Sequence, residues 1–183
     1  MSAPTGTTPR ADGFGFWDRQ LDRLGGRDPV AVLAETPAAV TDLVSATRDA
    51  SALRRRPGER AWSALEVVGH LIDVEWVFGF RTRTVLCDEV PEFGGIDQDR
   101  WVAVQRWNER DPADLLERFS GLRRVNLSTW AQLRPAELER SGLHRDAGVR
   151  LSLDLMRRIL AGHDLQHMDQ IRAALAGASG GTG

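Results

Sequence analysis

The sequence contains no lysine and no tyrosine, and it has a single cysteine, Cys87. A single cysteine excludes a disulfide bond within the chain. No apolar run approaches the ~20 residues that a membrane-spanning helix needs. The opening stretch, MSAPTGTTPRADG, also lacks the apolar centre of a signal peptide. These absences predict a cytoplasmic protein without a membrane anchor.

The sequence also lacks an excess of charge of either sign. It has 24 basic and 26 acidic residues, and its formal net charge is -2. Proteins that bind nucleic acid usually present a strongly positive surface, so the composition argues against a nucleic-acid partner. The length of 183 residues fits one domain with a substantial core.

Both ends of the chain are small, polar and rich in glycine. We expect flexible tails over residues 1–15 and 178–183, and one domain over residues 16–177.

Helix signals dominate this domain. Each of the first three predicted helices begins with a capping residue that is followed by a favoured proline or glutamate: Thr36 with Pro37, Ser63 with Glu66, and Asp111 with Pro112. A fourth helix is predicted from about Leu151 to Ala176. A long connection that contains PEFGGIDQDRW, residues 91–101, precedes the third helix, and a shorter one with a helical turn near Ala136 follows it. Because no strand alternation is sustained, we predict an all-α fold, an antiparallel four-helix bundle.

The stretch AGHDLQHMDQI places His163 and His167 one turn apart on the face that carries the apolar residues of the last helix. His70 lies on the apolar stripe of the second helix. Buried imidazoles need partners, and three of them can bind one divalent ion while leaving coordination positions open for water or substrate. The pattern therefore predicts a metal site of His70, His163 and His167.

Acidic and amide groups flank these histidines. Glu66 and Asp73 lie one turn before and one turn after the histidine of the second helix, and Gln170 follows the pair on the last helix. Each is a candidate to orient a ligand or to move a proton. Trp62 and Trp76 are candidates for the wall of a pocket.

Simpler explanations exist for each of these residues. A single histidine on an apolar face is often a hydrogen-bonded core residue, and HxxxH pairs are common on exposed helices without a metal. His144, in the last connection, is either an ordinary loop histidine or a substrate contact or fourth ligand. A site with a fourth ligand would be structural rather than catalytic.

Three other polar residues are expected to play no part in the site. Asp164 is adjacent to a predicted ligand but points about 100° away along the helix, so we expect it at the rim. Arg123 is expected on a solvated face. Cys87 is expected to be a small buried side chain.

Several separated segments resemble the DinB/YfiT-like family of four-helix-bundle proteins. They are WSALEVVGHLIDVEWVFGFR, DQDRWV, RSGLHRDAGVRLSL and AGHDLQHMDQI, and the likeness extends roughly from Pro37 to Leu175. It implies a bundle of DinB/YfiT type with long crossover connections and a metal bound by His70, His163 and His167. It also implies a homodimer.

The resemblance implies a metal-dependent enzyme that acts on a small molecule. The reaction would be thiol-dependent S-transfer, with a low-molecular-weight thiol of the bacillithiol or mycothiol type, or a hydrolysis. The ion would be zinc or nickel, with iron or manganese as further candidates. Catalytic roles would fall to Glu66, Asp73, Gln170 and His144. The alternative is a stress-associated metal-binding dimer without catalytic activity.

Overall fold

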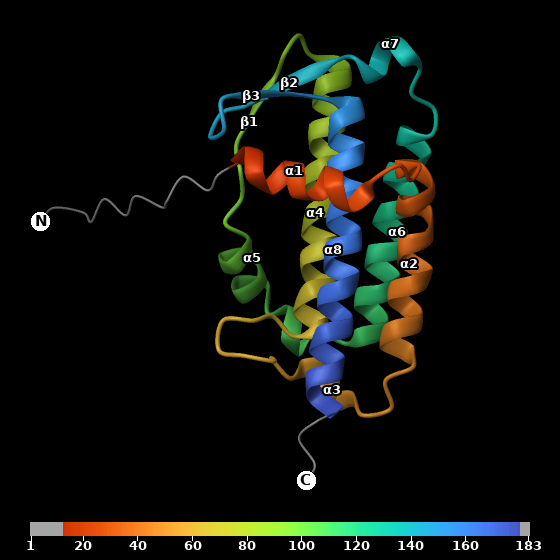
Figure 1. The fold of residues 1–183 in the computed structure, drawn as a ribbon, viewed down its shortest axis with the longest axis vertical. Helices are drawn as coiled ribbons and strands as arrows, with labels where there is room; N and C mark the ends of the chain where they lie inside the picture. Colours follow the sequence, from red (N-terminus) through yellow and green to blue (C-terminus); the bar gives the residue numbers. More distant parts are fainter. Residues whose placement is uncertain (1–12, 180–183) are drawn as a thin grey trace, which may run out of the picture.

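A computed structural model describes residues 13–179 of the chain. Four long helices form a bundle (Figure 1): α2 (Pro29–Ser45), α4 (Ala64–Cys87), α6 (Pro112–Trp130) and α8 (Leu153–Ser179). Helix α2 packs against α6 and α8, and α4 packs against the same two helices, so the four close into a ring. The predicted four-helix bundle is confirmed.

The helix directions depart from a simple antiparallel bundle. Figure 1 shows α2 and α8 running one way along the bundle and α4 and α6 running the other way. The neighbours α4 and α6 are therefore parallel, which requires a connection that returns along the length of the bundle. That connection contains β1 (Glu92–Phe93), α5 (Gln98–Gln105) and a short 3-10 helix, η1 (Trp107–Glu109).

Two of the helices outside the predicted four precede α4 in the chain. Helix α3 (Ala50–Arg54) is short, and α1 (Gly13–Leu24) crosses the bundle and packs on α8 (Figure 1). The crossing is close, because a Cβ at Gly162 would lie 1.9 Å from the Gln20 carbonyl oxygen. Helix α1 begins inside the tail expected over residues 1–15. The rest of that tail, residues 1–12, lies outside the described residues. The same holds for residues 180–183 of the tail expected over residues 178–183.

A small sheet caps one end of the bundle. It consists of β1, β2 (Ser141–His144) and β3 (Val149–Ser152), with β1 parallel and β3 antiparallel to the central strand β2. The expected helical turn near Ala136 is present as α7 (Pro135–Leu138). The strands have only two to four residues each, too few for alternation to be recognised in the sequence.

The predicted starts of α4 and α6 are confirmed. Ser63 and Glu66 form a reciprocal capping box, in which the Ser63 hydroxyl accepts a hydrogen bond from the Glu66 amide and the Glu66 carboxylate accepts one from the Ser63 amide. Asp111 caps α6, and Pro112 occupies the first helical position. Both local signals therefore specify where these helices begin.

The predicted start of α2 at Thr36 and Pro37 is wrong. The helix begins at Pro29, and the Asp28 side chain accepts a hydrogen bond of 2.8 Å from the Ala31 amide. Pro37 lies inside the helix. Because proline has no N–H, the carbonyl of Leu33, four residues earlier, lacks its usual helical donor.

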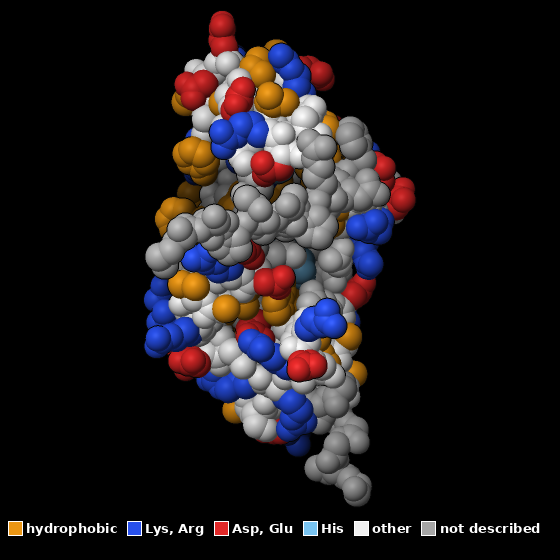
Figure 2. All heavy atoms as spheres, turned by 90° about the vertical axis from the view of Figure 1, so that its left-hand side faces the viewer, with side chains coloured by type: hydrophobic (Ala, Val, Ile, Leu, Met, Phe, Trp, Pro, Cys, Tyr) orange, Lys and Arg blue, Asp and Glu red, His pale blue; other side chains and the backbone are white. Residues whose placement is uncertain are grey.

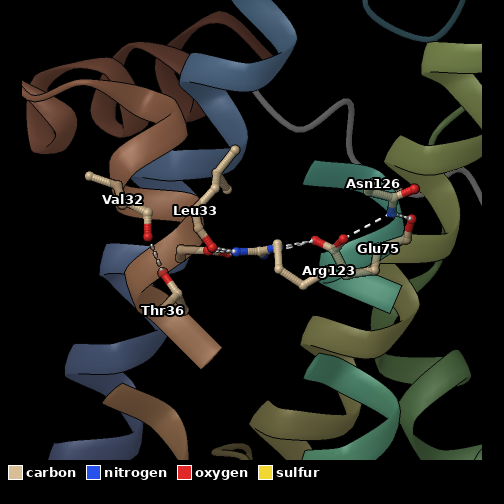
Figure 3. A network of polar contacts seen from close by, with 7 residues as sticks. Val32, Leu33, Thr36, Glu75, Arg123 and Asn126 are labelled. Carbon is tan, nitrogen blue, oxygen red and sulfur yellow. Dashed lines mark hydrogen bonds and ion pairs between the residues drawn. The ribbon is translucent and has the colours of Figure 1, made fainter. Parts of the chain in front are cut away.

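Arg123 of α6 supplies the missing donor. Its Nη1 donates to the Leu33 carbonyl at 2.8 Å, and the guanidinium lies between that carbonyl and Glu75 of α4 (Figure 3). It also donates to Glu75 at 2.9 Å and to Asp164 of α8 at 2.6 Å. We call Leu33, Glu75, Arg123, Asn126 and Asp164 the arginine network. It joins all four helices of the bundle.

The positions of Arg123 and Asp164 correct two expectations. Arg123 is 1% exposed rather than on a solvated face, and Asp164 is 0% exposed rather than at the rim. Burial alone would lower the pKa of Arg123, but the charges of Asp164 and Glu75 more than offset this and raise it. The amide of Asn126 completes the network by donating to the Glu75 carboxylate at 2.9 Å.

The substitution Arg123→Met should strongly destabilise the protein. It would leave Glu75 and Asp164 buried without their positive partner, and loss of one member of a buried ion pair typically costs about 3–5 kcal/mol. Urea denaturation would measure the free energy of unfolding. The neighbouring Arg124 is exposed, so Arg124→Met should change it by no more than about 0.5 kcal/mol. Equal effects of the two substitutions would contradict a structural role of the network.

Candidate metal centre

The three histidines predicted as ligands lie together between α4 and α8. His70 is 1% exposed, His163 7% and His167 5%. The Nε2 atom of His163 lies 3.2 Å from Nε2 of His70 and 3.0 Å from Nε2 of His167. One ring nitrogen from each residue lies within 4.8 Å of the other two. The packing of α4 on α8 therefore brings two distant segments of the sequence to one point.

Hydrogen bonds alone cannot satisfy this arrangement. The Nδ1 atom of His167 lies 2.7 Å from Oε1 of Gln170, which accepts its proton. A neutral His167 then has a lone pair on Nε2. Nε2 of His163 carries either one proton or one lone pair, so it can form a hydrogen bond with only one of its two neighbours. A cation that accepts three lone pairs would satisfy all three Nε2 atoms together, while Nδ1 of His70 and Nδ1 of His163 have no hydrogen-bond partner among the described residues.

The spacing and the chemistry of the donors both fit a divalent ion. Nitrogen ligands about 2.0–2.1 Å from a tetrahedral zinc ion lie about 3.3 Å from one another, close to the 3.0 and 3.2 Å between the Nε2 atoms. Imidazole nitrogen suits zinc and nickel. Among the described residues, the group of possible ligands contains these three histidines and no fourth side chain.

The surroundings keep the three rings neutral. Burial is the largest cause of the lowered pKa values, which are about 3 for His70 and about 4 for His167. Burial, followed by the neighbouring histidines and Arg123, holds the pKa of His163 well below its ordinary value. Neutral imidazole is the form that binds metals, so no proton has to leave the site near neutral pH.

Aromatic side chains surround the rings. Trp62 lies 4.8 Å from His70 and stacks on His167 at 6.3 Å between ring centroids. Trp62 therefore packs against two of the three rings, whereas Trp76 is 63% exposed. Phe16 of α1 lies 6.5 Å from His163, edge to face. The sequence pattern did not point to Phe16, because the crossing of α1 over α8 leaves no periodic signal.

The carboxylates expected beside His70 have other partners. Glu66 accepts hydrogen bonds from the Ser63 amide and the Arg56 guanidinium. Asp73 accepts hydrogen bonds from Gln105 at 2.6 Å and Trp107 at 2.9 Å. Burial raises the pKa of Asp73 despite these two bonds. Both residues hold neighbouring segments on α4, while Gln170 contacts a histidine of the centre directly.

The candidate His144 and the single cysteine lie away from the three rings. His144 is outside the cluster and lies on β2, between Trp17 and Phe93. Cys87, at the end of α4, is exposed rather than buried. The helix ends there, so the thiol lies beyond the last packed turn.

The sequence model of the DinB superfamily matches residues 32–171. This match includes all of α4 and α6, most of α2 and α8, and all three histidines of the centre. The chain therefore belongs to the DinB superfamily.

Two individual proteins show what the chain is similar to. It is 26% identical over 122 residues, 67% of this chain and 69% of the relative, to a protein of Oceanobacillus iheyensis named "Putative metal-dependent hydrolase". Its fold matches that of YfiT from Bacillus subtilis with a TM-score of 0.74, at 19% identity and over 95% of this chain and 91% of the other. YfiT is described as "a probable metal-dependent hydrolase with an unusual four-helix bundle topology".

The surface beside the sheet and α5 is mixed in charge. Figure 2 shows arginine and acidic side chains interspersed over this face rather than gathered by sign. Among the described residues, no helix combines the length and the apolar character needed to span a membrane.

Proposed function

We propose that this protein is a metal-dependent hydrolase of small molecules, with a zinc or nickel ion held by His70, His163 and His167. The observation that carries the proposal is the meeting of three Nε2 atoms, 3.0 and 3.2 Å apart, that hydrogen bonds cannot satisfy together. The names of the two similar proteins support the class of reaction. Three protein ligands leave room for a reacting group, whereas structural zinc sites usually have four.

The residues of the chain divide the work around such an ion. The three imidazoles bind as neutral ligands, and Gln170 fixes the tautomer and the orientation of His167. A divalent ion held by these three histidines would supply a nucleophile near neutral pH by lowering the pKa of a bound water or thiol. Trp62 shields one side of the rings from water. Glu66 and Asp73 act indirectly in this proposal, by fixing α4 against neighbouring segments.

Each of the substitutions His70→Ala, His163→Ala and His167→Ala should abolish stoichiometric metal binding, because two imidazoles alone make a weak site. The measurement is metal content by elemental analysis of protein purified without an affinity tag and dialysed against zinc or nickel. The matched control is His144→Ala, which removes the one histidine outside the cluster and should leave one ion per chain. Full metal content in any of the three cluster variants would contradict the ligand assignment.

Hydrolysis should depend on the same ion. Metal-loaded protein, tested against chromogenic esters, amides and phosphate esters, should show turnover that a chelator removes and that His70→Ala lowers by at least about a hundredfold. The variant Cys87→Ser should keep full activity, because this exposed thiol is remote from the rings.

The same assay separates the rival functions. Turnover that requires an added low-molecular-weight thiol would identify the enzyme as an S-transferase instead. A large loss of thermal stability in chelator, without turnover under any condition, would identify the ion as structural.

A homodimer is the proposed assembly. Trp76 and Phe80, one turn apart on α4, are 63% and 66% exposed, and apolar side chains gathered on a surface often mark an interface. The double substitution of both residues by glutamate should convert a dimer into a monomer in sedimentation experiments. Val104→Glu on α5, where the side chain is 71% exposed, is the control and should leave the dimer intact. A monomeric wild-type chain would contradict this assembly.

A further inference from the structure

A second buried arginine lies near the sheet, and its charge lacks a close partner. Arg81 of α4 is 8% exposed. Its Nη2 donates to the Gly94 carbonyl at 2.6 Å. Among the described residues, no carboxylate oxygen lies within 4.0 Å of its nitrogens. A guanidinium has five N–H donors, so most of them have no acceptor within the described part of the chain.

The contrast with Arg123 shows that this is unusual. Arg123 is buried more deeply, at 1% exposed against 8% for Arg81, and two carboxylates surround it. Buried charges in proteins are generally paired. Arg81 instead lies over the rings of Phe93 and Phe78, at 4.9 and 5.6 Å from their centroids. Such contacts favour a cation on the ring face, but they do not accept the in-plane N–H bonds.

His144 adds a second group without a partner at the same place. Its ring meets the ring of Phe93 edge to face at 6.0 Å, so Arg81 and His144 both contact Phe93. The Nδ1 atom of His144 is buried and has no hydrogen-bond partner. Burial, and after it the positive charge of Arg81, lowers the pKa of His144. The imidazole is therefore neutral near pH 7 and offers one N–H.

Asp146 supplies the nearest negative charge, but it is held elsewhere. It lies in the exposed turn between β2 and β3, and its Oδ2 accepts a hydrogen bond of 2.6 Å from the Gly95 amide. Burial lowers the pKa of Arg81 to about 10, and the charge of Asp146 only partly opposes this. Arg81 thus stays charged at neutral pH while the edge of its guanidinium lacks an anion.

We propose that Arg81 and His144 form a binding site for the carboxylate group of a small aromatic or aliphatic molecule. The planar guanidinium matches a carboxylate through two parallel hydrogen bonds, and one positive charge beside a neutral imidazole balances one negative charge. Phe93 and Trp17, which lies 5.4 Å from His144, supply apolar walls for the rest of the molecule. The site does not depend on a metal at the three histidines, so it can be tested independently of the proposed hydrolase function.

The test is titration calorimetry of the full chain with benzoate, in the presence of a chelator so that a bound metal cannot contribute. The wild-type protein should bind one benzoate per chain and should not bind benzamide, which has the same shape without the charge. Arg81→Gln should weaken binding by at least about tenfold, as expected for loss of a charged bidentate pair. The matched control is Arg150→Gln, which removes an exposed arginine of the same hairpin and should change the affinity by less than about twofold.

Two further variants keep the result decisive. Arg81→Lys retains the buried charge, so it should fold even if Arg81→Gln does not, and it should still bind benzoate more weakly than the wild type. Asp146→Asn removes the competing negative charge and should strengthen binding. Absence of saturable binding in the wild type, or equal affinities of the wild type and Arg81→Lys, would overturn the site. Tighter binding of inorganic phosphate than of benzoate would overturn its assignment to carboxylates.

Discussion

The bundle depends on the way in which Arg123 compensates for Pro37. A proline inside α2 leaves the Leu33 carbonyl without a helical donor, and that carbonyl faces the centre of the bundle. The guanidinium of Arg123 donates to it and at the same time binds carboxylates from α4 and α8. One side chain therefore fixes four helices relative to one another. A shift of any of them along its axis would leave a buried charge or carbonyl without its partner.

The candidate metal centre inherits its geometry from that network. Asp164, which binds Arg123, directly follows His163 on α8. Glu75, on α4, lies little more than one turn after His70. Because the ion pairs of Arg123 fix the relative positions of α4 and α8 near these residues, they also hold the rings of His70 and His163 close together. The two clusters differ in how their polar groups are paired. In the arginine network every charged group has a partner of opposite charge, whereas the histidines present lone pairs to one another.

Local signals in the sequence were sufficient to predict a structural feature where the residue pattern is compatible with only one local structure. Ser63 with Glu66 predicted the start of α4, and helical periodicity placed the three histidines on buried faces. Pro37 was ambiguous, because a proline suits the first turn of a helix and is also tolerated inside one when another group satisfies the freed carbonyl. That group is the Arg123 guanidinium. Arg123 lies 90 positions after Leu33 in the sequence, so no local pattern could reveal the contact. The short strands and the crossing of α1 over Gly162 likewise depend on contacts between distant segments.

The pattern of satisfied and unsatisfied polar groups distinguishes structural from binding positions in this protein. Among the described residues, the buried side-chain atoms without a hydrogen-bond partner belong to Gln20, His70, His144 and His163. Buried polar atoms without partners are rare in folded proteins because each destabilises the native state. The arginine network shows that this chain can satisfy even a buried guanidinium completely. At His144 the unpartnered atom is Nδ1, beside Arg81, where we infer that a bound carboxylate completes the structure. At the three histidines we infer an ion from the Nε2 atoms, which lie 3.0 and 3.2 Å apart.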